Sequence, residues 1–188
     1  NATTDIEFLF PFGWGELWGI ASRTSYDLTQ HMEHSKQSLE YLDPETNEKY
    51  IPFVVESSVG CDRLALAILS DAYVLEELEN DTREVLKLHP ALAPYKVCIL
   101  PLNKKIHGEK ALEIFNNLSK KFSCAYDESG SIGKRYRRED AIGTPFCITI
   151  DDNTLNNNTV TVRDRDTMEQ ITIGVDEIDN YVNEKITL

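Results

Sequence analysis

Hydrophobic and polar positions along the chain change their spacing several times, and these changes predict alternating strands and helices. Residues 8–23 are rich in Phe, Trp and Gly, and the glycines disfavour a helix, so this segment predicts strand, turn and strand. Asp27 can cap the helix that is predicted next. The β-branched and aromatic residues 50–56 predict a strand that ends in a tight connection. Asp62 then begins an apolar helical run that extends, with or without an interruption, to Leu78.

The pattern changes after residues 89–94, where two closely spaced prolines predict a domain boundary. The polar residues 153–158 are expected to form a hairpin loop. The later apolar runs predict strands at 95–100, 124–127, 146–150 and 160–165, and helices at 108–122, within 130–142 and at 176–185. This alternation predicts a first domain at 1–92 and, at 93–188, a compact α/β domain in which helices cover a mixed sheet.

The composition is that of a globular protein, with 41% hydrophobic and 27% charged residues. No hydrophobic run reaches the roughly 18 residues that a membrane span needs. The 4 cysteines lie far apart without a Cys-x-x-Cys pair, which disfavours a zinc knuckle and a dense disulfide framework. We therefore expect no membrane partner, no metal bound by the protein alone, and a reducing, cytoplasmic location.

Charge is distributed unevenly. The net charge of −13 argues against a nucleic-acid binder, and against a DNA partner, when the chain is taken as a whole. Residues 96–138, however, contain more Lys and Arg than Asp and Glu. Because local potential decides where a polyanion binds, the second domain is a candidate RNA-binding surface. An ordinary solvated surface explains the same charges, and both interpretations stay open.

Two segments combine residues suited to binding chemistry. A strand delivers Glu56 and Ser58 to its end, and Gly60 opens a helix with Arg63 in its first turn. A carboxylate suits an ammonium group, whereas a guanidinium and the amide groups of a helix start suit phosphate. The alternative is a capped helix with a surface Arg–Glu pair. In the second segment Glu16 interrupts an apolar, glycine-rich strand, where a carboxylate is costly unless a cation meets it. 

Arg23 is the candidate cation for Glu16. A Glu–Arg pair inside the sheet is one interpretation, and a shared ligand is the other. The two segments together resemble glycyl-tRNA synthetases of class II. The segment GWGELWGIA at 13–21 is similar to the strand before the third signature motif of that family. ESSVGCDR at 56–63 matches the motif itself, in the form Glu-x-Ser-x-Gly-x-x-Arg, and GKRYRR at 133–138 with GTPF at 143–146 is similar to the anticodon-binding domain.

The resemblance implies a fold of two parts: the end of an antiparallel-sheet catalytic domain, followed by an anticodon-binding domain. It implies an aminoacyl-tRNA ligase that activates glycine with ATP and Mg²⁺ and transfers it to tRNA-Gly, working as a homodimer at full length. The residues expected to bind ATP are Glu16, Leu17, Gly60, Cys61, Asp62 and Arg63. Those expected to bind glycine are Glu56, Ser57, Ser58, Val59, Gly60 and Arg23. The candidate tRNA contacts are Lys104, Lys105, Lys134, Arg135, Arg137, Arg138, Arg163 and Arg165.

Glycine has no side chain that an enzyme could bind, so selectivity for glycine must come from excluding larger amino acids. Trp14, Trp18 or Val59 is expected to wall the pocket. The first two signature motifs of the family are not found in these residues, so we expect the fragment to be inactive by itself. Two alternatives stay open: a non-catalytic RNA-binding module, and a sensor that binds glycine and ATP without ligation.

Overall fold

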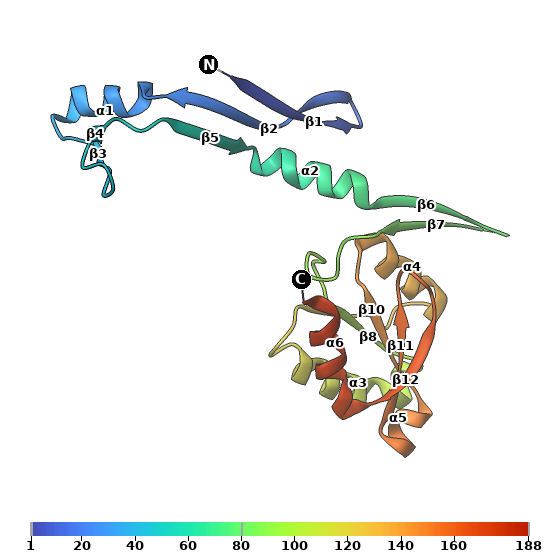
Figure 1. Cartoon of the computed structure of the whole chain (residues 1–188). Helices are drawn as coiled ribbons and strands as arrows, with labels where there is room; N and C mark the ends of the chain where they lie inside the picture. Colours follow the sequence, from blue (N-terminus) through green and yellow to red (C-terminus); the bar gives the residue numbers. More distant parts are fainter. Residues whose placement is uncertain (1, 80, 188) are drawn as a thin grey trace. The chain divides into compact units, whose positions relative to one another are not determined.

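The computed structural model describes residues 2–79 and 81–187 and divides into two compact units, residues 1–70 and residues 71–188. Each unit is described by itself. Among the described residues, no helix combines the length and the hydropathy that a membrane crossing requires. Figure 1 shows the elements of both units in chain order.

The first unit is built on a three-stranded antiparallel sheet in the order β1-β2-β5. Its elements are β1 (Thr3–Phe10), β2 (Gly13–Thr24), α1 (Tyr26–Ser35), β3 (Tyr41–Leu42), β4 (Lys49–Tyr50), β5 (Val54–Val59) and α2 (Cys61–Ala72), whose last two residues lie in the second unit. Gly13 closes the β1–β2 hairpin at φ 114°, a conformation that side chains disfavour. The predicted strand, turn and strand at 8–23 is therefore confirmed.

Two local predictions in this unit are wrong. Ser25, rather than Asp27, precedes α1, and its carbonyl accepts the first helical hydrogen bond, from Thr29 N at 3.0 Å. The strand predicted at 50–56 instead runs from Val54 to Val59 as β5, because its whole length pairs with β2. Of the residues 57–60 that were expected to form a tight connection, 57–59 are thus part of the sheet.

The second unit contains a five-stranded mixed sheet in the order β12-β11-β10-β8-β9. Its elements are β6 (Tyr73–Leu78), β7 (Asp81–Leu86), β8 (Val97–Pro101), α3 (Lys104–Leu118), β9 (Cys124–Tyr126), α4 (Ile132–Ile142), β10 (Phe146–Ile150), α5 (Asp152–Asn157), β11 (Thr159–Asp164), β12 (Gln170–Gly174), a short 3₁₀ turn (Val175–Glu177) and α6 (Ile178–Ile186). Strands β8, β9 and β10 run parallel, whereas β11 and β12 are antiparallel. The predicted mixed sheet is confirmed.

Helices cover both faces of this sheet, so every residue of its central strands β8 and β10 is buried, rather than every second one. Val97 and Ile99 pack with α3 and α6 on one face. Cys98 and Leu100 pack with α4 on the other face. This double burial explains why β8 and β10 could be recognised from their sequences alone.

Two expectations in the second unit need correction, and a third stays a prediction. The apolar run after Asp62 does not continue as a helix to Leu78, because α2 ends at Ala72 and β6 pairs with β7 as a hairpin. The polar segment 153–158 forms most of helix α5 rather than a hairpin loop, because Asp151 caps it through Asn153 N and Thr154 N. The hairpin β6–β7 also belongs to the second unit, so the compact units divide earlier than the boundary at 92/93, which stays a prediction for the domains.

Candidate functional site

A β-bulge at Leu17 decides which side chains share a face of the first unit's sheet. The neighbours Ile6 and Glu7 of β1 pair with Trp18 and Glu16 of β2, so Leu17 is the extra residue. One extra residue reverses the alternation of side chains beyond it. Glu16 and Trp18 therefore lie on opposite faces, although a regular strand would place them on the same one.

The face that carries Glu16 also carries the predicted carboxylate and hydroxyl of β5. A Cβ atom added to Gly19 would lie 3.3 Å from Glu16 Oε1, so both residues are on this face. Gly19 pairs with Ser58, and Ala21 pairs with Glu56. Since directly paired residues of an antiparallel sheet project to the same side, Glu16, Ser58 and Glu56 share one face around a glycine. We call this surface the carboxylate face.

The other predicted glycine-binding residues of β5 project to the opposite face. Ser57 Oγ accepts a hydrogen bond of 2.7 Å from Trp18 Nε1, and Val59 pairs with Trp18. Of the three side chains expected to wall the pocket, only Trp14 shares the carboxylate face, because it lies two residues before Glu16. The structure therefore separates the predicted wall into two surfaces.

Arg63 is fixed beside the carboxylate face by the chain of β2. It lies in the first turn of α2, and its Nη1 donates a hydrogen bond to the main-chain carbonyl of Glu16. Leu64 N bonds to Gly60 O at 2.8 Å, which closes the first turn of the helix. Cys61 is exposed at the same helix start, with Asp62 beside it. Arg63 therefore contacts the main chain of Glu16, and the roles expected for the two side chains stay predictions.

Arg23 contacts carboxylates other than Glu16. Its Nε and Nη2 donate to the two oxygens of Asp27, both at 2.9 Å, and its Nε lies 3.6 Å from Glu56 Oε2. The hydrogen bond from Arg23 lowers the pKa of Asp27, and the same bond raises the pKa of Arg23. Both side chains are solvent-accessible, so water screens the pair and its contribution to stability is small.

Two further carboxylates lie on the same face but were not identified from the sequence. Asp5 pairs with Gly19, and its Oδ1 would lie 3.7 Å from a Cβ at that position. Glu7 pairs with Glu16. The alternation of Asp5 and Glu7 with Ile6 and Phe8 was an available signal, because a period of two separates the faces of a strand.

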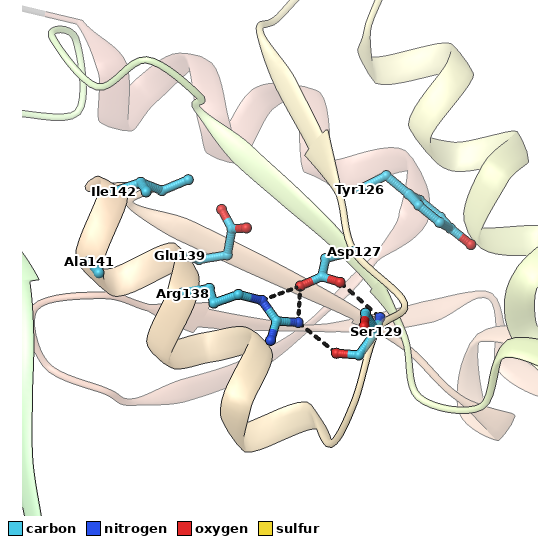
Figure 2. Close-up of a pocket in the computed structure, with 7 residues that line it drawn as sticks. All are labelled: Tyr126, Asp127, Ser129, Arg138, Glu139, Ala141 and Ile142. Carbon is cyan, nitrogen blue, oxygen red and sulfur yellow. Dashed lines mark hydrogen bonds and ion pairs between the residues drawn. The ribbon is translucent and has the colours of Figure 1, made fainter.

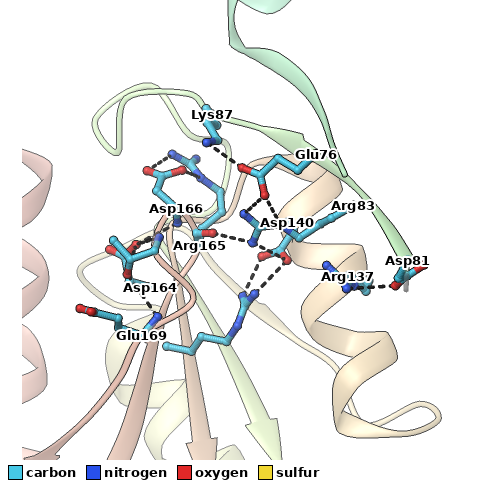
Figure 3. A network of polar contacts seen from close by, with 12 residues as sticks. Glu76, Asp81, Arg83, Lys87, Arg137, Asp140, Asp164, Arg165, Asp166 and Glu169 are labelled. Carbon is cyan, nitrogen blue, oxygen red and sulfur yellow. Dashed lines mark hydrogen bonds and ion pairs between the residues drawn. The ribbon is translucent and has the colours of Figure 1, made fainter. Parts of the chain in front are cut away.

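In the second unit, three arginines take part in a buried network that joins the β6–β7 hairpin to the sheet (Figure 3). Asp140 is fully buried and accepts hydrogen bonds from Arg163 at 2.8 and 3.0 Å and from Arg83 at 3.2 Å. Arg83 also donates to Glu76 and to the carbonyl of Arg165. Burial disfavours the charge of Arg163, but its bonds to Asp140 outweigh this effect and raise its pKa.

The predicted tRNA contacts divide into buried and surface groups. Arg135, Arg163 and Arg165 are buried, and their guanidinium groups bond to protein atoms such as Pro101 O, Asp140 and Gly143 O. A side chain held inside the protein cannot reach RNA without unfolding, so these three do not contribute to the proposed interface. Of the other members, Lys104, Lys105, Lys134 and Arg138 are exposed and Arg137 is half-buried.

Residues 96–185 match the family model described as "Anticodon binding domain". These residues are similar to that family. The predicted similarity of GKRYRR and GTPF to such a domain is therefore confirmed, and the matched residues include all five strands of the mixed sheet with α3, α4, α5 and most of α6.

The curated relatives cover nearly the whole chain. It is 65% identical over 187 residues to the glycine–tRNA ligase of Clostridium tetani and 63% identical over 186 residues to that of Caldanaerobacter subterraneus subsp. tengcongensis. Each alignment covers 99% of this chain but 40% of the relative, so the chain spans well under half the length of these proteins. These relatives confirm the predicted resemblance to glycyl-tRNA synthetases.

Solved structures show the same fold at low sequence identity. The RNA-binding domain of threonyl-tRNA synthetase from Cryptosporidium parvum matches with a TM-score of 0.70 at 19% identity, over 97% of this chain and 42% of that one. Prolyl-tRNA synthetase from Giardia lamblia, in complex with prolyl-adenylate, matches with a TM-score of 0.64 at 19% identity, over 98% of this chain and 39% of that one. The predicted fold class is confirmed.

Proposed function

We propose that this chain is part of a glycine–tRNA ligase, which activates glycine with ATP and transfers the glycyl group to tRNA-Gly. One observation carries the proposal: the bulge at Leu17 turns Glu16 onto the face of Glu56 and Ser58, and Arg63 is anchored to the same strand. The name and the high identity of the curated relatives support it.

The groups on the carboxylate face, and those at the neighbouring start of α2, each suit one part of the substrates. The carboxylates of Glu56 and Glu16 would accept hydrogen bonds from the glycine ammonium group, and Ser58 would add a neutral hydrogen bond. Arg63 keeps donors besides Nη1 and would bind the phosphates of ATP. Gly60 and Cys61 would let the nucleotide approach the start of α2.

Selection for glycine requires that a larger amino acid be excluded. Gly19 lies between Glu16 and Ser58, and a Cβ atom at this position would lie 3.3 Å from Glu16 Oε1. Trp14 is the one aromatic candidate of the predicted wall that shares this face. We propose that Trp14 and the close spacing around Gly19 restrict the space beside the bound amino group.

The magnesium ion would enter with ATP. Among the described residues, no three His, Cys, Asp or Glu side chains are grouped to hold a metal ion. Mg²⁺ commonly takes phosphate oxygens and water together with only one or two carboxylates. The carboxylate face has acidic residues that fit this role, and the ion would neutralise phosphate charge during activation.

The reaction would depend on positioning rather than on a covalent protein intermediate. The groups that hold the ammonium would direct the glycine carboxylate toward the α-phosphate, and Arg63 would offset the negative charge of the phosphates. We propose that the chain by itself does not complete this reaction, and that the complete enzyme is a homodimer that works in the cytoplasm.

The test uses the full-length enzyme and glycine-dependent ATP–pyrophosphate exchange. Glu56→Gln is expected to raise the KM for glycine, and Arg63→Ala is expected to raise the KM for ATP, each by at least about 30-fold, since lost charged contacts cost about 2 kcal/mol or more. Glu45→Gln, in the exposed turn between β3 and β4, is the control and should leave both values unchanged. Unchanged KM values in both site variants would contradict the proposal.

The same assay separates the ligase from a sensor. A sensor would bind glycine and ATP, as measured by calorimetry, without any exchange by the full-length protein. The family match of residues 96–185 also supports a second candidate, an RNA-binding module that uses the anticodon-binding domain without ligation. Such a module would bind tRNA while the two site variants left its affinity and its cellular role unchanged.

A further inference from the structure

A surface hollow of about 660 Å³ lies between the end of β9 and α4 (Figure 2). Its lining comes from the strand end at Tyr126, Asp127 and Ser129 and from the helix at Arg138, Glu139, Ala141 and Ile142. Glu139 is buried and accepts a hydrogen bond of 2.6 Å from Thr144 Oγ1. Most of the exposed lining is apolar, and Arg138 and Asp127 are its other charged groups, which suits a flat ring with one polar edge.

Arg138 is held in one orientation at this hollow. Its Nε donates to Asp127 Oδ2 at 3.0 Å, and its Nη2 donates to the carbonyl of Ser129 at 2.6 Å. Figure 2 shows the two side chains in contact, Arg138 from α4 and Asp127 from the end of β9. Within the described residues, Nη1 has no recorded hydrogen-bond partner. A guanidinium group that is fixed on one side and open on the other is a preorganised donor.

Asp127 supplies an acceptor next to this donor. Burial alone would raise the pKa of Asp127, but hydrogen bonds from Ser129 N and Arg138 outweigh it and lower the pKa. The carboxylate is therefore ionised at neutral pH. An ionised carboxylate has about four acceptor positions on its two oxygens, so Asp127 retains capacity for one more donor.

The donor and acceptor edges of the RNA bases distinguish possible ligands for such a pair. Unstacked bases are usually read on their Watson–Crick edges and packed on apolar or aromatic side chains. Cytosine presents acceptors at O2 and N3 and a donor at its 4-amino group, which complements an arginine beside a carboxylate. Uracil presents a donor at N3 and an acceptor at O4, which would face the guanidinium and the carboxylate with the wrong polarity.

We propose that this hollow binds one unstacked cytosine of the glycine anticodon, with Arg138 donating to O2 and N3 and Asp127 accepting from the 4-amino group. Because glycine codons begin with two guanines, the middle and third bases of every glycine anticodon are cytosine. The inference rests on the proposed function, since it takes tRNA-Gly as the partner. It assigns base reading, rather than phosphate binding, to one of the exposed cations.

The test measures how strongly the 188-residue chain prefers cytosine. Binding of a glycine anticodon stem-loop RNA is compared with binding of RNAs in which the middle or the third cytosine is replaced by uracil, at two salt concentrations. The wild-type chain is expected to prefer cytosine at one position by about 5- to 150-fold. Arg138→Gln is expected to reduce the ratio of the affinities for the cytosine and the uracil RNA to about 1. Arg138→Lys is expected to lose this preference while it keeps most of the affinity for RNA.

Arg137→Gln is the matched control. Arg137 lies on the same helix and carries the same charge, but it pairs with Asp81 outside this hollow. Loss of the Arg137 charge should weaken the binding of the cytosine and the uracil RNA equally and leave the preference for cytosine unchanged. Circular dichroism checks that each variant is folded.

Each other outcome is decisive. If Arg138→Gln weakens the binding of both RNAs equally, Arg138 contacts phosphate and the base-reading inference is overturned. If Arg138→Gln keeps the full preference, the cytosine is read elsewhere and the inference is also overturned. If the wild-type chain binds neither RNA, or binds them without preference, anticodon recognition in the proposed function fails as well.

Discussion

The two units differ in how their structures are held together. In the second unit, 13 apolar residues from strands β8, β10 and β11 and helices α3 and α6, with one from the loop before β9, form a buried cluster. Among the described residues of the first unit, the buried apolar side chains are Phe10 and Ala67 alone. Large side chains such as Trp14 and Phe53 are mostly exposed there.

This difference shows that stability and site geometry are encoded in different ways. Burial of apolar surface stabilises the second unit by about 25 cal/mol for each Å² removed from water, so its fold depends on its core. The carboxylate face depends instead on strand register, above all on the one extra residue in β2. Changes to the core should therefore affect stability, and changes to the register should affect activity.

Inserting one alanine between Ile6 and Glu7 is expected to have the largest effect. The inserted residue would pair with Leu17 and remove the bulge, so Glu16 and Trp14 would project to the face of Trp18. In the full-length enzyme, kcat/KM for pyrophosphate exchange should fall by about 10³-fold or more, because a charged contact to the substrate is lost. Leu17→Ala keeps the residue count and the bulge, and should cost less than about 10-fold. Similar losses in the two variants would show that local packing at the bulge, and not the register, is what matters.

Replacing Asp140 by Ala is expected to destabilise the second unit by about 3–5 kcal/mol, because Arg83 and Arg163 would keep buried charges without their shared partner. Both tryptophans, Trp14 and Trp18, lie in the first unit. The urea midpoint of unfolding measured by circular dichroism should therefore fall. The midpoint measured by tryptophan fluorescence should stay unchanged.

The control for this substitution is Asp166→Ala. Asp166 also pairs with an arginine, Arg165, but its side chain is 46% exposed. Its loss should cost at most about 1 kcal/mol. If Asp140→Ala and Asp166→Ala lower the free energy of unfolding equally, burial does not determine how much each ion pair contributes to stability.

The sequence predicted the second unit well because its signals are local. Continuous apolar runs identified β8 and β10, whose faces are both buried. The β6–β7 hairpin was missed because Leu75 and Leu78 also fit a helical spacing. Its position depends on the contact of Arg83 with Asp140, which lies 57 residues away and leaves no local pattern.

The chemical character of the site could be predicted, but its faces could not. The residue types at Glu16, Glu56 and Arg63 indicated an acidic and a basic partner for a ligand. Which side chains share a surface depends on the register between β1 and β2, and a bulge exists only in that pairing. Burial of Arg135, Arg163 and Arg165 was equally hidden, because a basic residue in a sequence does not reveal its partner.

The smallest expected effects are opposite pH trends in the two units. Burial raises the pKa of Glu139 in the second unit, so its contribution to stability is present below the ordinary carboxyl pKa and is lost as pH rises through the raised value. Asp27 in the first unit has a lowered pKa, so its contribution is present above the ordinary carboxyl pKa and is lost as pH falls. Glu139→Gln should therefore gain stability over the wild type as pH rises, by circular dichroism. Asp27→Asn should approach the wild type as pH falls, by tryptophan fluorescence. Parallel trends would contradict the assigned environments of these carboxylates.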